Sequence, residues 1–445
     1  MSAPVSSGKG MPLHTKILIG LVVGAVLGLL FHSFAPQNLN DAVNRYVAYP
    51  IGQVFFRMLY MVVMPLVFAS IALGVAGLGD LKAAGRVGSK SLAYFFATTF
   101  VAAALGLMMV NLIEPGNHLD TAVRDGLIQE YAGEAATKVE ASQRATESFG
   151  IETIVNIVTR NPIKSAADGD MLGVIFFGLM FGIALTMLAR EKAAPMIQWL
   201  DALNEVVVKI VELAMRIAPY GVAALIFGVT SKFGFGLMQT LGLYVVTVLG
   251  ALLLHTLLTI PAILRFIVGM NPVTFFSRIR SSIITAFSTS SSAATLPTNL
   301  AVAEQNLGIP PQIGGFVLPL GSTMCMNGTA IFEGITVLFL AQLFDVDLSL
   351  GQQIIVVVMS VLTAVGAAGV PGGSIPLLVG IMTMFGIPGE AIGIVLGVDR
   401  ILDMSRTTVN VIGDLSATAF VGKSEGVWTP AMLPSQDAIP ADEDL

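Results

Sequence analysis

Charged residues are scarce in this sequence, and cysteine is almost absent. Only 12% of the 445 residues are charged and 55% are hydrophobic, whereas about one quarter of a typical soluble domain is charged. The single cysteine, Cys325, excludes an internal disulfide and a cysteine-built metal cluster. A net charge of −6 argues against nucleic acid as a partner. So long and so apolar a chain is predicted to lie in a lipid bilayer.

Long apolar runs predict where the chain crosses the bilayer, because a spanning helix needs about 20 apolar residues. The first run resembles part of a signal peptide, but no clear small-residue cleavage site follows it, so we expect it to be retained. Six spans are predicted before the last third of the chain, at residues 15–33, 52–78, 91–112, 171–188, 205–229 and 241–268.

Basic residues between these spans predict their orientation, because Lys and Arg favour the cytoplasmic side. They precede the first span, separate the second from the third, and follow the fourth and the sixth. The amino terminus is therefore predicted inside and the long acidic segment 114–170 outside, with no chemistry assigned to that segment. The basic residues are Lys9, Lys16, Lys82, Arg86, Lys90, Arg190, Lys192, Arg265, Arg278 and Arg280.

Two apolar segments of the last third are interrupted at their centres. Residues 281–301 have a polar centre at 288–292, and residues 354–384 are broken by glycines and Pro371. Such centres cannot face lipid, because their backbone groups would go unpaired. We interpret both segments as re-entrant hairpins whose tips meet inside the protein. Each precedes a long helix, at 313–343 and 391–421, so the order forms a repeat that is inverted in secondary transporters.

The predicted final helix carries one continuous polar stripe. Its members are spaced by four, three, four and four residues, which places them on one helical face. Charges inside a membrane are costly and usually line a pathway or a site, although an ion-paired packing stripe is the alternative. The stripe consists of Asp399, Asp403, Arg406, Asn410 and Asp414.

Three residues of this stripe indicate a ligand. The guanidinium of Arg406 offers a planar fork suited to a carboxylate, the carboxylate of Asp403 suits an ammonium, and the amide of Asn410 can bind a second carboxylate. Together they describe an acidic amino acid. Asp403 and Arg406 can also pair with each other. This pairing is compatible with substrate binding if it occurs only while the site is empty.

The hairpin tips and an interrupted helix add further candidates. Hydroxyls and amides at Ser290, Ser291 and Ser292 can hold a carboxylate, the alternative being a packing turn of small residues. The second tip, residues 369–373, is rich in glycine and can approach a ligand closely and move as a gate. A break at 321–329 would free carbonyls able to coordinate a cation.

Glu333 follows that break inside the apolar run. A carboxyl group buried at membrane depth is a candidate proton carrier, and the alternative is a structural hydrogen-bonding acid. A channel would need a continuous polar lining in several helices, but the polar residues concentrate in the last third. An intramembrane serine hydrolase would need a partnered base, and none is evident beside His255.

These motifs together resemble the dicarboxylate/amino acid:cation symporter family, the glutamate transporter homologues. The resemblance covers almost the whole chain. It rests on the serine-rich tip from Ser290 to Pro297, the Met326-Asn-Gly-Thr329 break, the Gly369-Val-Pro-Gly372 tip and the final stripe. It implies an all-α polytopic protein with eight transmembrane helices, two re-entrant hairpins, a homotrimer and an elevator mechanism. It also implies a transporter rather than an enzyme, without an organic cofactor.

The resemblance further implies a division of the chain. Residues 1–88 and 117–237 would form a scaffold that holds the trimer together. Residues 89–116 and 238–425 would form a transport domain that slides through the scaffold, and residues 426–445 a polar cytoplasmic tail. The protein would sit in a bacterial or archaeal plasma membrane with both termini in the cytoplasm.

The family pattern assigns a role to each residue of the pocket. It places the substrate amino group on Asp403, the side-chain carboxylate on Arg406 and the main-chain carboxylate on Asn410. The presence of both charged residues favours aspartate or glutamate over a C4-dicarboxylate. The pattern completes the pocket with Ser291, Ser292, Thr329, Val370, Gly373 and Thr407.

Departures from the family concern the cations. The break usually reads Asn-Met-Asp-Gly-Thr but here reads Cys325-Met-Asn327-Gly-Thr329, so the sodium site that these residues share with Thr98 and Thr99 is expected to be degenerate. A second sodium site, built from Gly321, Asn410 and Asp414, is retained.

Two expectations follow from these departures. With one sodium site degenerate, proton coupling through Glu333 is favoured, and sodium coupling at fewer sites is the alternative. Many relatives also carry an arginine near the pocket, at the positions of Ser290 or Met404, and this chain has neither.

Overall fold

The computed structural model describes residues 13–121, 123–129, 158–168, 171–365, 369 and 372–434, and within these ranges it is built of helices joined by short turns, without a strand. The predicted tip residue Val370, most of the segment 114–170 and the tail beyond residue 434 lie outside the described residues. The all-helical class predicted from the sequence is confirmed.

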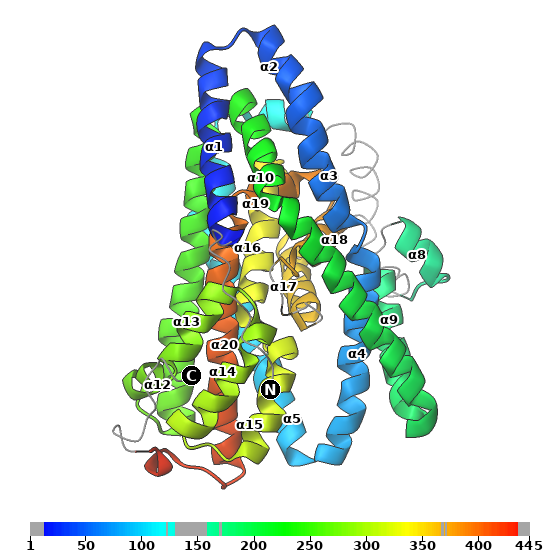
Figure 1. The fold of residues 1–445 in the computed structure, drawn as a ribbon, viewed down its shortest axis with the longest axis vertical. Helices are drawn as coiled ribbons and strands as arrows, with labels where there is room; N and C mark the ends of the chain where they lie inside the picture. Colours follow the sequence, from blue (N-terminus) through cyan, green and yellow to red (C-terminus); the bar gives the residue numbers. More distant parts are fainter. Residues whose placement is uncertain are drawn as a thin grey trace, which may run out of the picture.

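The first half of the chain forms long helices with short interruptions (Figure 1). The helices are α1 Leu13–Phe34, α2 Gln37–Val43, η1 Asn44–Ala48, α3 Tyr49–Tyr60, α4 Val63–Ala84, α5 Arg86–Ile113, η2 Pro115–His118, α8 Pro162–Asp168, α9 Met171–Met187, α10 Arg190–Leu254, η3 His255–Thr259, α11 Ile260–Ala262 and η4 Ile263–Val268.

The second half forms shorter helices that alternate with breaks. They are α12 Pro272–Arg278, α13 Arg280–Thr289, α14 Ser292–Ala301, η5 Val302–Asn306, α15 Pro311–Met324, α16 Asn327–Leu343, α17 Leu350–Val365, α18 Ile375–Met384, η6 Gly389–Ala391, α19 Ile392–Leu396, α20 Asp399–Ser424 and η7 Pro430–Met432. Helix breaks are therefore observed at the two polar or glycine-rich centres and, within the predicted stretch 321–329, at residues 325–326.

Two glycines join long helices through left-handed backbone. Gly234 has φ of 67° in the middle of α10, so this 65-residue helix is two helices, one rising and one descending in Figure 1. The positive φ favours glycine here, and a Cβ at Gly234 would fall 2.8 Å from the His32 ring, which would have to shift. Gly85, with φ of 65°, is the single residue between α4 and α5. The predicted fifth and sixth spans thus meet at Gly234.

Helix length and composition indicate membrane crossing. Among the described residues, four helical stretches are long and apolar enough to span a bilayer: Thr15–Phe34, Arg86–His118, Arg190–Val268 and Pro311–Leu343. The α4–α5 and α9–α10 connections, α12 and the end of α20 lie at the same, lower end of the molecule in Figure 1. These regions carry Arg86, Lys90, Arg190, Lys192 and Arg278, which are among the basic residues on which the predicted orientation rests.

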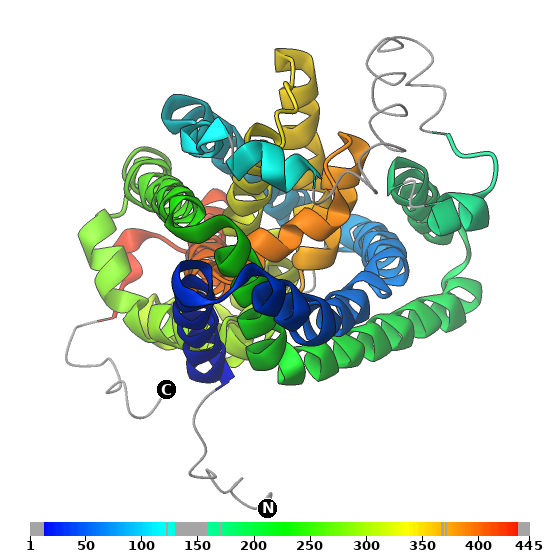
Figure 2. The same cartoon turned by 90° about the horizontal axis from the view of Figure 1, so that it is seen from above.

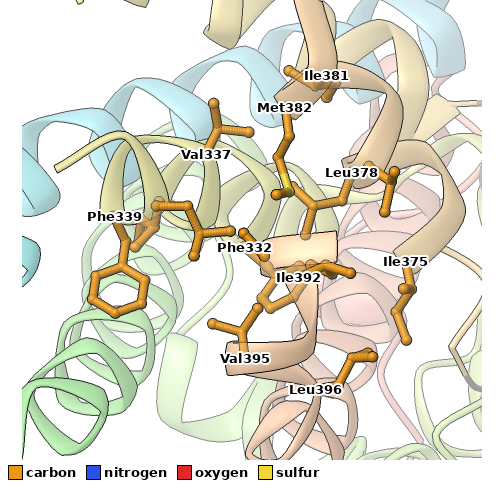
Figure 3. Packing of buried hydrophobic residues seen from close by; sticks show 14 of the residues in the cluster. Phe332, Val337, Phe339, Ile375, Leu378, Ile381, Met382, Ile392, Val395 and Leu396 are labelled. Atoms are coloured by element: carbon orange, nitrogen blue, oxygen red, sulfur yellow. The ribbon is translucent and has the colours of Figure 1, made fainter. Parts of the chain in front are cut away.

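The core lies around α16, in which every residue from Asn327 to Ala341 is buried. A helix that is apolar on all sides must be surrounded by others, and α16 contacts α5, α17 and α20. Figure 3 shows Phe332 of α16 packed with Leu378 of α18 and Ile392 of α19. Seen from above, the helices of the last third occupy the centre, with α1, α3 and the first part of α10 along one side (Figure 2). The predicted site residues of α20 are therefore held in the interior.

Candidate functional site

The tips of the two helix pairs α13–α14 and α17–α18 touch each other. Ser290 ends α13 with φ of 51°, and Ser291 caps α14 by accepting a hydrogen bond from the Ala294 amide. The Ser291 hydroxyl donates to the Gly369 carbonyl of the second tip across 2.6 Å, and the Ala293 amide donates to the same oxygen across 3.2 Å. The meeting of the tips predicted from the sequence is thus seen in the contact of Ser291 with Gly369.

The break between α15 and α16 is tied to α20. Asn410 accepts a hydrogen bond from the Gly328 amide across 2.8 Å, and its Nδ2 donates to Thr329 Oγ1 across 3.1 Å. A Cβ at Gly328 would fall 2.3 Å from the Arg406 carbonyl oxygen, so only glycine fits this crossing. One amide on α20 therefore satisfies polar groups that the broken helix leaves unpaired.

The charged part of the stripe forms one buried cluster. Arg406 Nη1 donates to Asp399 Oδ1 across 3.0 Å, and Arg406 Nε donates to Asp403 Oδ1 across 3.1 Å. The other oxygen of Asp403 accepts from the Gly372 amide of the second tip across 3.1 Å. Asp403 and Arg406 therefore pair with each other, as the sequence allowed, and Asp403 also holds the second tip.

A further arginine joins this cluster. Arg400 is only 6% exposed, and its Nη1 lies 3.5 Å from Asp403 Oδ2. The sequence analysis did not select it, because it lies beside the polar stripe rather than on it. Asp403 thus has two guanidinium neighbours, both from its own helix.

A small cavity of about 20 Å³ lies between the tips, the break and α20, with room for about one water molecule. Ser292, Thr329, Asp403, Arg406, Thr407 and Asn410, all predicted to bind the substrate, line it. Ser291 borders it through the tip contact described above, and Gly373 is buried nearby without lining it. Four further lining residues complete the wall: Ser290, Met326, Gly369 and Ser374.

Ser374 is a candidate that the sequence analysis missed. Its side chain is 4% exposed, and its hydroxyl has no hydrogen-bond partner among the described residues. Its position directly after the Gly372-Gly373 pair of the second tip was the available signal. A buried hydroxyl without a partner is costly, so this group is suited to a polar ligand.

The two predicted cation sites differ in their hydrogen bonding. The side-chain oxygen of Asn327 accepts hydrogen bonds from Thr98 across 3.2 Å and from Thr99 across 2.8 Å. Asp414 is fully buried, and neither of its carboxylate oxygens has a hydrogen-bond donor among the described residues. A Cβ at Gly321 would fall 2.6 Å from Asp414 Oδ1, so the broken helix lies against this carboxylate.

Glu333 lies on α16, fully buried, one residue after Phe332. Its Oε2 accepts a hydrogen bond from Thr363 of α17 across 2.7 Å, and its Oε1 has no partner among the described residues. The Phe332 ring centroid is 4.1 Å from the Arg406 guanidinium carbon, a cation–π contact. Arg406 lines the small cavity, so the residue next to Glu333 in the chain contacts the cavity wall.

Comparison with known proteins identifies the family. The profile of the "Sodium:dicarboxylate symporter family" matches residues 13–424. The chain belongs to this family. It is 34% identical over 419 residues to the proton/sodium-glutamate symport protein of Bacillus subtilis (strain 168), with 94% of each chain covered.

Two further relatives of the protein extend the comparison. The proton/glutamate-aspartate symporter of Escherichia coli (strain K12) is 33% identical, with 93% of each chain covered. The excitatory amino acid transporter 3 of Oryctolagus cuniculus is 32% identical over 92% of this chain and 85% of the relative. The protein is accordingly a multi-pass membrane protein of a transporter family.

Proposed function

We propose that this protein is a secondary active symporter that takes up aspartate or glutamate, driven by a proton gradient. The buried Asp403–Arg406 pair beside the two tips carries the proposal, because it offers one group for an ammonium and one for a carboxylate. The hydroxyls and amides of Ser292, Thr329 and Asn410 surround the same cavity. The names of the relatives support an acidic amino acid as substrate.

The cavity of about 20 Å³ is too small for an amino acid, so binding requires the tips to separate. The contacts that must break are those of Gly369 with Ser291 and of Gly372 with Asp403. When the substrate ammonium takes over Asp403, it displaces the Gly372 amide and releases the second tip. In this proposal the second tip is a gate, and its position depends on whether substrate is bound.

The architecture completing this proposal has eight spans, two re-entrant hairpins and an elevator mechanism in a homotrimer. Residues 1–88 and 117–237 form the scaffold, and residues 89–116 and 238–425 form the transport domain. The packing of α1 on α10 and of α4 on α9 supports a scaffold, and the packing of α20 on α13, α15 and α16 supports a transport domain. Both termini lie in the cytoplasm of a bacterial or archaeal cell.

An enzymatic role is not part of the proposal. Among the described residues, the Ser291 hydroxyl donates to a backbone carbonyl, and the Ser290 hydroxyl has no partner. A serine nucleophile needs a base in hydrogen-bond contact. The ring nitrogens of His255 likewise have no partner within the described ranges.

Glu333 carries the coupling proton in this proposal. A neutral acid on the inward journey and an ionised one on the return would couple one proton to each cycle. The side-chain oxygen of Asn327 accepts hydrogen bonds from Thr98 and Thr99. Because residue 327 is an amide, it carries no negative charge to offset that of a sodium ion. This arrangement supports the loss of that site.

Sodium coupling at a reduced number of sites is the second candidate, and Asp414 is the observation that favours it. A fully buried carboxylate without donors suits a hard cation with oxygen ligands, together with the Gly321 carbonyl and Asn410. A C4-dicarboxylate symporter is the third candidate, and the presence of Asp403 argues against it because a dicarboxylate brings no ammonium.

Uptake into proteoliposomes tests these proposals. We expect accumulation of labelled aspartate or glutamate under an inward proton gradient without sodium, and loss of its pH dependence in Glu333→Gln. The matched control is Asp414→Asn, which neutralises a buried carboxylate outside the Asp399–Asp403 cluster. Uptake that requires sodium, ignores the proton gradient and is lost only in Asp414→Asn would replace proton coupling by sodium coupling. Accumulation of neither amino acid would overturn the proposed function.

A further inference from the structure

We propose that Arg400 is a positioning residue that sets the affinity for the acidic substrate. It acts as the counter-ion for the carboxylates that Arg406 releases when the substrate binds. The inference rests on the proposed function and adds a residue for which the sequence pattern gave no role.

The surroundings of Arg400 are those of a guanidinium with unused donors. The residue is 6% exposed, and its Nη1 lies 3.5 Å from Asp403 Oδ2, beyond a short hydrogen bond. Neither its Nε nor its Nη1 has a hydrogen-bond partner among the described residues. Asp399 precedes it in the chain and lies within its electrostatic range. A guanidinium has five N–H donors. Because Nε and Nη1 of Arg400 have no hydrogen-bond partner within the described part of the chain, this buried group can accept a further anionic partner.

The empty site is electrically balanced. Two carboxylates, Asp399 and Asp403, face two guanidiniums, Arg400 and Arg406, and their formal charges sum to zero. Arg406 makes the close contacts, at 3.0 Å to Asp399 and 2.9 Å to Asp403. Arg400 therefore contributes charge to the empty cluster without holding either carboxylate tightly.

Substrate binding changes the partners of Arg406 and adds one net negative charge, because an acidic amino acid carries two carboxylates and one ammonium. The substrate carboxylate takes the Arg406 fork and the substrate ammonium takes Asp403. Asp399 then loses the hydrogen bond that Arg406 donated, and a buried carboxylate without a partner is strongly disfavoured. Arg400, with free hydrogens on Nε and Nη1, is the group that can replace Arg406 at Asp399.

Neighbouring ionisable groups do not replace it. Tyr244 of α10 lies close to the cluster, but its hydroxyl is hydrogen bonded to Thr336 at 2.8 Å. Glu333 of α16 is an acid and already accepts from Thr363. A permanent structural pair between Arg400 and Asp403 is the simpler alternative, and the two ideas differ in what removal of Asp399 does.

The test compares four proteins in proteoliposomes: wild type, Arg400→Gln, Asp399→Asn and the double variant. KM and maximal rate are measured for aspartate and glutamate. Loss of one charge-assisted contact corresponds to about one decade in affinity or more. We expect Arg400→Gln to raise KM about tenfold with a smaller effect on maximal rate. The double variant is expected to return KM to within about threefold of Asp399→Asn, because Asp403 is then paired with the substrate ammonium and the carboxylate that Arg406 would leave unpaired is absent.

Arg400→Lys is the conservative control and is expected to retain most of the affinity, because it keeps the charge. Wild-type KM in Arg400→Gln overturns the inference, as does a tenfold rise of KM when Arg400→Gln is added to Asp399→Asn. The second comparison decides the matter if the single Arg400→Gln variant does not fold, as judged by size-exclusion chromatography. Failure of the wild-type protein to take up either amino acid would instead overturn the proposed function.

Discussion

Thr99 donates a 2.8 Å hydrogen bond to the side-chain oxygen of Asn327, across the contact between α5 and α16. Thr98 donates to the same oxygen. A carboxylate at this position would attract a cation between the helices, whereas the amide oxygen is uncharged and accepts hydrogen bonds from the two threonine hydroxyls. The residue type at position 327 thus decides whether α5 and α16 are linked there by hydrogen bonds or by a bound cation.

The first prediction reverses that residue type. The double variant Asn327→Asp, Cys325→Asn restores a carboxylate and an oxygen ligand, and we expect uptake to become stimulated by sodium. Coupling between two ligands typically changes affinity by about 5- to 150-fold, so the substrate KM should fall at least fivefold in sodium relative to choline. Asn327→Ala is the control without a carboxylate. An equal response to sodium in both variants would contradict this account of the site.

The second prediction concerns selectivity. Arg406→Thr removes the guanidinium while leaving Asp403 and Asn410, so acidic substrates should lose a charge-assisted contact of about 1.5–3 kcal/mol, one to two decades in affinity. Neutral amino acids are expected to gain in relative uptake. Arg265→Thr, at an exposed position of η4, is the matched control. Competition assays against labelled aspartate measure both effects, and unchanged binding of aspartate in Arg406→Thr would refute the assignment.

The third prediction concerns topology. In a Cys325→Ser background, which has no other cysteine, single cysteines are introduced at two exposed positions: Arg160, before α8, and Ser89, near the start of α5. The orientation rule places the first outside and the second inside. A membrane-impermeant thiol reagent should label Arg160→Cys in intact cells and Ser89→Cys only after permeabilisation. The reverse pattern would invert the proposed orientation.

The fourth prediction concerns the end of α20. Lys90 donates a 2.6 Å hydrogen bond to Glu425, and Arg86 forms a second ion pair at 3.3 Å. The hydrogen bond from Lys90, aided by Arg86, lowers the pKa of Glu425 below its ordinary value of 4.5. A depressed pKa means that the stabilisation is present above the unfolded pKa and is lost as pH falls through the folded pKa.

Thermal unfolding checks that sign. Wild type should melt above Glu425→Gln at neutral pH, and the difference should vanish in acid as Glu425 becomes protonated. Glu304→Gln is the control, at an exposed acid of η5. A difference between wild type and Glu425→Gln that persists below the lowered pKa would show that these ion pairs are not its source.

The sequence predicted the interruptions within the apolar segments better than the turns and helix ends that connect the spans. Polar or glycine-rich centres in apolar runs marked the tip at Ser290 and the break at Cys325, because such backbone must find partners inside the protein. The turn at Gly234 lies between the predicted spans 205–229 and 241–268, but its tightness could not be predicted, since the chain is helical on both sides and a single positive φ reverses it. Helix ends near Tyr60 and Leu396 depend on packing that no local pattern records.

The part of the site that was predicted best is the set of residues on the single helix α20. The spacing of the stripe placed Asp403, Arg406 and Asn410 on one face, and all three line the same cavity. Arg400 was missed because a helical stripe selects residues by angle, whereas a long guanidinium reaches across its own helix. The hydroxyl of Thr363, which binds Glu333, comes from another helix, and only tertiary structure could reveal it.

Gly85 has a mechanical consequence in a protein that works as proposed. It is the single residue between α4, assigned to the scaffold, and α5, which belongs almost entirely to the transport domain, and a Cβ there would meet nothing within 4 Å. So short a tether has no slack, so the stroke of the moving domain must come from unwinding the adjoining helix ends. Each residue that passes from helix to extended chain lengthens the tether by about 2 Å. The number of residues unwound beside Gly85, and beside Gly234 near the last crossing between the two proposed domains, therefore sets how far the substrate can be carried.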